Sequence, residues 1–163
     1  MDETEGGYRE KQYASLGDGI KHLNKVLKRA YGSEVKRRKR LQKSGGSELV
    51  KAQRPFDLPK DMNSAPLCDT FSGMSLAIEG KPRFISTNQE IKVAGIQVPS
   101  HVFFINSEGS VVDPTFGQHL ARMGTDPVRF RKDNRDLFER GIFVGNVQKA
   151  KSIGVDYFPN KYR

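Results

Sequence analysis

Three side chains of the types that cooperate in nucleophilic catalysis occur along the chain in the order cysteine, histidine, aspartate. They are Cys68, which is the only cysteine, then His101 and Asp113. A cysteine attacks as the thiolate, and its ordinary pKa of about 8.5 leaves only a few per cent ionised at neutral pH. An adjacent imidazole can take the thiol proton, and a carboxylate on the far side of the ring fixes its tautomer. The order therefore predicts a catalytic triad for attack on an amide or thioester carbonyl.

The stretch SHVFFINSEGSVVDPTF, residues 100 to 116, predicts the antiparallel hairpin that positions two of these groups. With a turn centred on Ser107 and Glu108, facing residues have numbers that sum to about 215. A shift of one residue from this register brings the side chains of His101 and Asp113 together. Pro114 holds Asp113 extended and ends strand pairing there. The two side chains are thus expected at matched strand ends.

Periodicity predicts the elements around the hairpin. Residues 67 to 80 place apolar side chains near a helical stripe, which predicts a short buried helix with Cys68 in its first turn, where unpaired N–H groups favour the thiolate. Asp18 and Gly32 are the expected cap and stop of a first helix, followed by a helix-permissive basic stretch and a Ser-Gly-Gly linker. The remaining expected elements are strands at 82–88, 91–98 and 142–146, helices at 116–124 and 126–141, and an irregular tail at 155–163.

This element order predicts an α+β fold with N-terminal helices, a cysteine-bearing helix packed on a small antiparallel sheet, and a C-terminal helix. Two regions are expected: a flexible acidic start and basic helical arm over residues 1–46, and an α+β catalytic domain over residues 47–163. In the longer C-terminal helix, Asp126 is the expected N-cap and Pro127 the first helical residue. The mean hydropathy of −0.64 indicates a modest core.

The segments CDTFS and HVFFINSEGSVVDPT, within residues 60 to 117, resemble the transglutaminase-like and papain-like cysteine fold. That resemblance implies Cys68 as nucleophile, His101 as base and Asp113 as orienting acid, an order that arylamine acetyltransferases and several bacterial glutamine deamidases share. The interval from Cys68 to His101 is shorter than in transglutaminases proper, and Phe103 replaces the usual tryptophan. The implied activities are those of a protease, a deamidase or an acyltransferase, with a protein or peptide as substrate.

An acyl-transfer site also needs donors for the developing oxyanion. The backbone N–H of Cys68 is one candidate, and the resemblance implies an amide side chain shortly before the cysteine, for which Asn63 and Gln53 are available. His22 and His119 are expected to face solvent without a role. Neither HExxH, GxGxxG nor GxxxxGK[ST] occurs, so no metal or cofactor is expected.

The net charge of +9 is concentrated in one segment. Residues 21 to 60 hold 13 Lys or Arg against 3 acids, whereas residues 61 to 163 hold 13 against 11. Phosphates of nucleic acid, an anionic membrane surface contacted through residues 21–43, a nuclear import receptor, or solvent alone would each suit this charge. The densest run of candidate anion-binding residues comprises Lys36, Arg37, Arg38, Lys39 and Arg40.

Two functions from different classes follow from these patterns. One is a cysteine enzyme of the effector or toxin type that acts on a partner protein. The alternative is a noncatalytic protein that binds nucleic acid or another anionic surface through residues 21–60, with Cys68 as a small core side chain. The acidic start lacks the features of a signal peptide and no apolar run would span a bilayer, so we expect a cytoplasmic protein, with delivery to another cell or to a nucleus left open.

Overall fold

A computed structural model describes residues 10–43, 58–80 and 83–160 of the chain. The helical elements are α1 (Leu16–Lys43), η2 (Met62–Ser64), η3 (Cys68–Phe71), α3 (Gly117–Arg122), α4 (Pro127–Asp133), η4 (Arg135–Leu137) and α5 (Val147–Ser152). The strands are β1 (Glu10–Tyr13), β2 (Ser75–Ile78), β3 (Phe84–Val93), β4 (Ile96–Ile105), β5 (Ser110–Asp113), β6 (Phe138–Glu139), β7 (Ile142–Asn146) and β8 (Val155–Asp156).

Among the described residues, eight strands form one curled sheet in the order β1-β2-β3-β4-β5-β7-β6, with β8 paired to β3. The pairing of β1 with β2 is parallel and the other pairings are antiparallel. A mixed α/β fold on a largely antiparallel sheet is therefore confirmed. The proposed boundary near residue 46 and residues 1–9 of the acidic start lie outside the described residues. The end of that start is not flexible as expected, because Glu10–Tyr13 forms strand β1.

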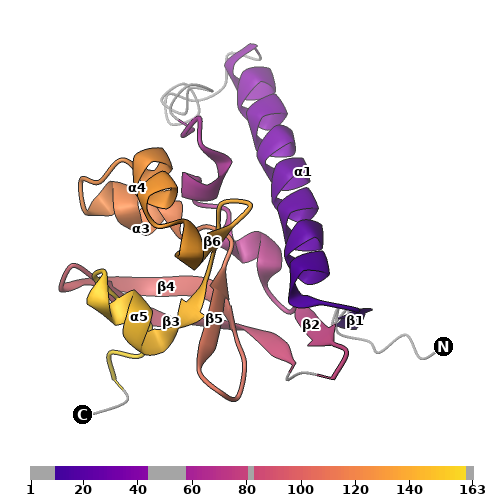
Figure 1. Cartoon of the computed structure of the whole chain (residues 1–163). Coiled ribbons are helices and arrows are strands. Elements are labelled where there is room, and N and C mark those ends of the chain that lie inside the picture. The colour runs from indigo at the N-terminus through magenta and orange to yellow at the C-terminus, as the bar shows by residue number, and fades with distance from the viewer. Residues whose placement is uncertain (1–9, 44–57, 81–82, 161–163) are drawn as a thin grey trace.

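Neighbouring residues of the central strands point to opposite faces of the sheet and build two cores. Phe103 and Val111 belong to one core, whereas Phe104 and Val112 belong to the other. The first core is covered by α3, α5 and the segment after β8; the second is covered by η3 and the N-terminal half of α1 (Figure 1). The buried residues of α1 are confined to its N-terminal half, and the rest of the helix extends past the sheet.

The expected start and stop of the first helix are wrong. Ser15 caps α1: its Oγ accepts a hydrogen bond from the Asp18 N–H at 3.2 Å and donates to Asp18 Oδ2 at 3.0 Å, so Asp18 lies inside the first turn. Gly32 does not end the helix, because one glycine costs only about 1 kcal/mol. Beyond Gly32, Glu34 pairs with Arg37 and Arg38 one turn away and supports the last turns. None of the described helices has the apolar length that a bilayer span requires.

The expected helix over residues 67 to 80 is also wrong. Cys68–Phe71 forms a single 3-10 turn, Gly73 adopts a positive φ of 75°, and the chain continues as strand β2. The apolar residues of this stretch fit a strand after Gly73 as well as they fit a helix, and pairing with β1 and β3 decides the outcome. Cys68 therefore does not head a long helix packed on the sheet.

Other boundaries follow local chemistry more closely. The helix after Asp126 has the predicted cap and first residue, but it ends at Asp133 rather than near Gly141. Residues 84 to 98 form two strands that turn at Ala94 and Gly95, both with positive φ, where a single strand over 91–98 was expected. The strand at 142–146 and the helix within 116–124 are confirmed.

Candidate active site

The candidate site forms where β5 stops short of the length of β4. β5 pairs with β4 only through Phe104 and Ile105, so no strand of the described residues lies beside the edge of β4 at His101 and Val102 on that side. On the other side β4 stays paired with β3, where Gln89 faces His101. This leaves a gap at the sheet edge into which η3 and the loop after β5 bring side chains.

The observed hairpin register differs by one residue from the one centred on Ser107 and Glu108. Val112 faces Phe104, and extending that pairing places Asp113 opposite Phe103. His101 and Phe103 project from the same face of β4, and their rings stack at a centroid distance of 6.1 Å. Asp113 is consequently a diagonal neighbour of His101 on one face, and the predicted meeting of the two side chains is observed.

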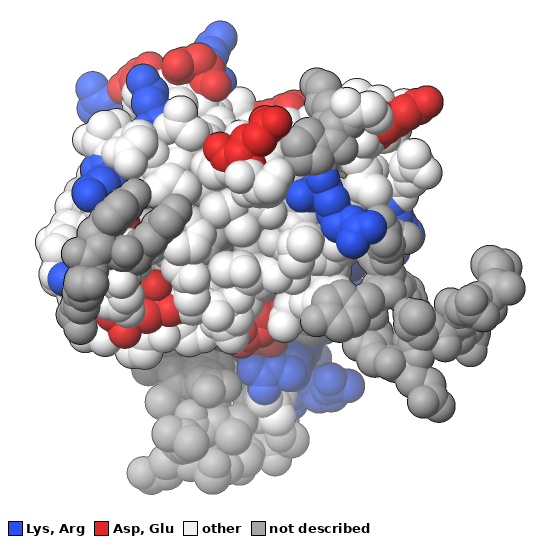
Figure 2. Space-filling model, turned by 90° about the horizontal axis from the view of Figure 1, so that it is seen from below, with Lys and Arg blue, Asp and Glu red and all other residues white. Residues whose placement is uncertain are grey.

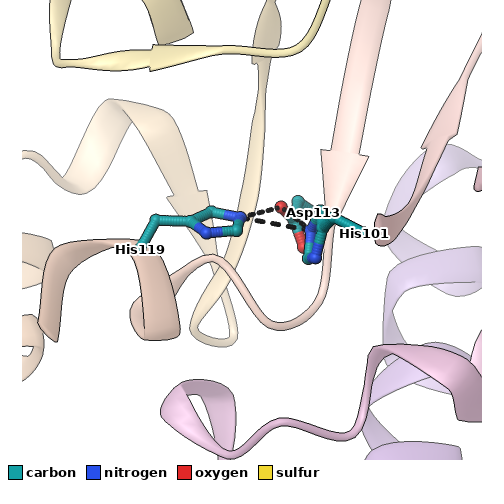
Figure 3. Close-up of side chains that lie close together, drawn as sticks. All are labelled: His101, Asp113 and His119. Carbon is teal, nitrogen blue, oxygen red and sulfur yellow. Dashed lines mark hydrogen bonds and ion pairs between the residues drawn. The ribbon is translucent and has the colours of Figure 1, made fainter. Parts of the chain in front are cut away.

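One carboxylate oxygen collects three donors from distant parts of the chain. Oδ2 of Asp113 lies 2.8 Å from His101 Nε2, 3.1 Å from His119 Nε2 and 2.6 Å from the hydroxyl of Tyr157, which donates to it. Figure 3 shows the two imidazole rings, from β4 and α3, converging on the carboxylate at the end of β5. The residues of this Asp113 cluster are His101, Asp113, Thr115, His119 and Tyr157, and each is at most 1% exposed.

The second carboxylate oxygen is used by the turn that follows. Oδ1 of Asp113 accepts a hydrogen bond from the Thr115 N–H at 3.1 Å and a longer one from its hydroxyl at 3.5 Å. Pro114, which lies between Asp113 and Thr115, has no N–H and so adds no further donor to this carboxylate. The donors to Asp113 fill the roughly four acceptor positions of a carboxylate. The two imidazoles and the carboxylate, whose ligand atoms lie within 4.8 Å of one another, are also of the types that bind metals.

Cys68 completes the gap from the η3 side. Its thiol interacts with the His101 side chain and with the backbone N–H of Val102 at the open edge of β4, and both interactions lower the pKa of the thiol. Because Nε2 of His101 faces Asp113, Nδ1 is the ring nitrogen that remains for the sulfur. Cys68 is half-buried whereas His101 is buried, so the sulfur is the part of this pair that a substrate can reach.

Electrostatics favour a thiolate and imidazolium pair. Burial raises the pKa of the Cys68 thiol, but the hydrogen bonds from His101 and Val102 and the charge of His101 outweigh it and lower that pKa. Burial lowers the pKa of His101, but the Asp113 charge and hydrogen bond, with Cys68, raise it to about 9. Burial also opposes ionisation of Asp113, yet His101 and His119 hold its pKa below the usual range. All three pKa shifts favour a thiolate at Cys68, an imidazolium at His101 and a carboxylate at Asp113.

His119 does not face solvent, which corrects the expectation from the sequence. It is buried on α3, where burial lowers its pKa against the opposing effect of Asp113, so it is a neutral imidazole that donates from Nε2. Gly117 allows α3 to come this close, since a Cβ there would lie 2.9 Å from the Asn63 carbonyl oxygen. His22, by contrast, is partly exposed on α1.

Sequence reasoning also missed Tyr157 and Gln118. Tyr157 follows β8, is fully buried, and has a pKa raised well above its ordinary value by burial and by Asp113, so it stays a donor. Gln118 donates to the Thr115 hydroxyl at 2.9 Å, and its Nε2 lies 3.5 Å from His101 Nδ1. The one signal in the sequence was a tyrosine with apolar neighbours close to the C-terminus.

The candidate oxyanion residue Asn63 is buried beside the site. Its Nδ2 donates to the Pro114 carbonyl at 2.8 Å, which ties η2 to the turn after Asp113. Gln53 lies outside the described residues. The basic run Lys36 to Arg40 lies on the exposed C-terminal half of α1, far along the helix from the residues that pack in the core.

Cys68 and the Asp113 cluster together have the parts needed for covalent acyl chemistry. These are a half-buried sulfur, an imidazole that interacts with it, and a buried carboxylate behind the imidazole. Comparisons with protein-family models, with curated proteins and with solved structures give no match. The geometry of the site is therefore the basis for its function.

Proposed function

We propose that the protein is a cysteine-dependent hydrolase or acyltransferase of the transglutaminase-like and papain-like type. The observation that carries the proposal is that His101 is hydrogen-bonded to Asp113 and interacts electrostatically with Cys68 at one gap in the sheet. The resemblance of residues 60 to 117 to that fold supports the same assignment. A protein or peptide carbonyl is the proposed substrate.

In the proposed reaction the Cys68 thiolate attacks the carbonyl carbon, and the carbon–sulfur bond forms as charge moves to the oxygen. His101 then gives its Nδ1 proton to the leaving nitrogen, the carbon–nitrogen bond breaks, and an acyl-enzyme remains. Water or an amine attacks the acyl-enzyme while His101 takes a proton back, which releases Cys68. Water gives hydrolysis or deamidation, and an amine gives transfer.

Within this scheme Asp113 keeps Nε2 of His101 protonated and the ring oriented. His119 and Tyr157 are positioning residues, because they bind Asp113 and hold its carboxylate in place. The low proton affinity of His119 means that Asp113 faces one imidazolium, not two. The charge of Asp113 is therefore directed at the catalytic imidazole.

The alkylation rate of Cys68 tests the proposal without a known substrate. Iodoacetamide should react near pH 6 with the folded wild-type protein, and His101→Ala should slow that reaction at least about tenfold, because an ordinary thiol has a pKa of about 8.5. His22→Ala is the matched control, since His22 lies outside the cluster, and it should keep the wild-type rate. Reaction that needs denaturant, or equal rates in all three proteins, would falsify the proposal.

A second candidate function is binding of nucleic acid through α1. The helix is continuous through Lys43, its C-terminal half projects from the domain, and within the described residues Lys36, Lys39 and Arg40 form no ion pair. The face of the molecule opposite this helix end has basic and acidic side chains interspersed (Figure 2). A gel shift with duplex DNA at low and moderate salt tests this function, and absence of a shift at low salt excludes it.

A further inference from the structure

A cleft of about 250 Å³ lies between β1, the first half of α1 and β2, and shares no residue with the Asp113 cluster. Its lining side chains fall into two groups. Val26, Met74 and Leu76 are apolar, and the remaining residues are hydrogen-bond donors, cations or both: Lys11, Tyr13, His22, Arg29 and Ser75. Among the residues that the structure describes, the lining contains no carboxylate. The cleft therefore offers donors and positive charge beside an apolar wall.

The hydroxyl of Tyr13 is a buried donor without a partner in the part of the chain that the structure describes. Burial raises the pKa of Tyr13, so the hydroxyl stays protonated and is available to donate. A buried polar group that makes no hydrogen bond costs on the order of 1–3 kcal/mol. Such a group beside a cleft lined with cations is suited to a ligand that brings an acceptor atom.

Positive charge converges on the same cleft from two elements. The pKa of His22 is lowered by burial and then by three cations: Lys11 on β1, and Arg29 and Lys25 on α1. The ring of His22 lies 5.7 Å from that of Tyr13, so the two rings form one side of the cleft. Within the described residues Lys11, Lys25 and Arg29 take part in no ion pair. A bound anion would relieve this like-charge repulsion.

We propose that this cleft binds a phosphate monoester that carries a small apolar group. The dianion accepts hydrogen bonds from the cations Lys11 and Arg29 and from the Tyr13 hydroxyl, which turns toward the cleft on binding, while the apolar group contacts Val26 and Met74. Charge-assisted bonds of this kind are about twice as strong as neutral ones. The volume is slightly below the roughly 300–1,000 Å³ typical of small-molecule sites, which favours a ligand of one ring. The site is separate from the proposed cysteine chemistry.

Titration with phenyl phosphate, followed by calorimetry and by the ring protons of His22 in NMR spectra, tests the proposal. The wild-type protein should bind phenyl phosphate, and the pKa of His22 should rise on binding because the dianion offsets the cations. Arg29→Gln should weaken binding at least about tenfold, since a hydrogen bond to a charged group contributes about 1.5–3 kcal/mol. Lys28→Gln is the matched control, because Lys28 is exposed on the same helix but outside the lining, and it should bind like wild type.

Tyr13→Phe separates the site from a general charge effect, since it removes only the unpartnered hydroxyl. It should weaken phenyl phosphate binding severalfold without lowering the resistance of the protein to urea. Equal weakening by Arg29→Gln and Lys28→Gln, or an equal response of His22 to chloride and phenol, would overturn the proposal. These outcomes are independent of Cys68 alkylation.

The same phosphate chemistry could come from a soluble metabolite or from a lipid headgroup. Flotation with phosphatidylcholine vesicles containing phosphatidic acid distinguishes these sources. Vesicle binding that phenyl phosphate displaces would identify the headgroup as ligand, and phenyl phosphate binding without vesicle binding would identify a soluble ligand. Vesicle binding that Arg29→Gln leaves unchanged, with no phenyl phosphate binding, would place the contact outside the cleft and overturn the proposal.

Discussion

Two carboxylates in this protein each bind two basic side chains, one in the core and one on the surface. Asp113 binds His101 and His119 where all three are buried, whereas Glu34 binds Arg37 and Arg38 on the projecting half of α1. Both carboxyl pKa values are lowered: that of Glu34 to about 2, chiefly by its hydrogen bond to Arg37, and that of Asp113 below the usual range against the effect of burial. Two basic partners thus lower the carboxyl pKa both on the surface, at Glu34, and in the core, at Asp113.

The two carboxylates differ in whether solvent can take the place of a partner that is lost. Water can solvate Glu34 or its arginines, and salt screens their attraction. The members of the Asp113 cluster are at most 1% exposed, so bulk solvent does not reach an imidazolium or hydroxyl that loses its partner, and each member depends on the carboxylate. A pKa shift therefore indicates function or stability only when it is read together with burial.

Asp113→Asn should have the largest effect. The amide carries no charge to stabilise a protonated His101, and its oxygen cannot accept from two imidazoles and Tyr157 at once, so buried donors are left without an acceptor. We expect the free energy of unfolding in urea to fall by about 3–5 kcal/mol and Cys68 alkylation near pH 6 to slow strongly.

Asp126→Asn is the matched control for this change, since Asn caps helices as well as Asp and Asp126 is exposed at the start of α4. It should stay within about 0.5 kcal/mol of wild type. A loss below about 1 kcal/mol in Asp113→Asn would show that the cluster is not held together by its charge.

An intermediate effect is expected from Cys68→Ser, read as a pH dependence. His101 has a pKa of about 9 in the folded protein and about 6.5 unfolded, so its protonation contributes stability that is complete below about pH 6.5 and is lost as pH rises through about 9. Cys68 has the opposite sign: its pKa is lowered, so its contribution is present above the unfolded value of about 8.5 and is lost as pH falls. In wild type the contribution of Cys68 rises with pH while that of His101 falls, so the two offset each other between about pH 6.5 and 8.5.

Removing the thiol should expose the His101 contribution alone. Between about pH 7 and 8.5, Cys68→Ser should lose stability with a slope of up to about 1.4 kcal/mol per pH unit, whereas wild type stays flatter. Urea unfolding at a series of pH values measures both slopes. Equal slopes would mean that Cys68 and His101 do not exchange a proton.

Features set by a few adjacent residues were predictable from the sequence. Asp126 and Pro127 start a helix because capping depends only on the next three residues, and the hairpin around Ser107 follows from alternation and a Gly turn. The meeting of His101 with Asp113 was also predictable, since hairpin register fixes it within one residue. Local chemistry therefore specified the half of the site that lies on one hairpin.

Features set by contacts between distant segments were not predictable. The residues after Gly73 fit two periodicities, and pairing with β1 and β3 makes them a strand. His119 reaches Asp113 because Gly117 lets α3 pack closely against η2, and Tyr157 reaches it because β8 pairs with β3. Six residues of α3 are too few for a burial pattern to be read from their periodicity.

Glu34→Gln should have the smallest effect and so completes the comparison with Asp113→Asn. Glu34 keeps about a sixth of its side chain exposed and sits on a helix half that packs little, so its pairs are screened. We expect a loss below about 1 kcal/mol at low salt that disappears in about 1 M NaCl, where the Debye length is about 3 Å. The loss in Asp113→Asn should persist in the same salt, because the cluster is out of contact with the ions. A loss in Glu34→Gln as large as that in Asp113→Asn would mean that burial does not separate the two carboxylates.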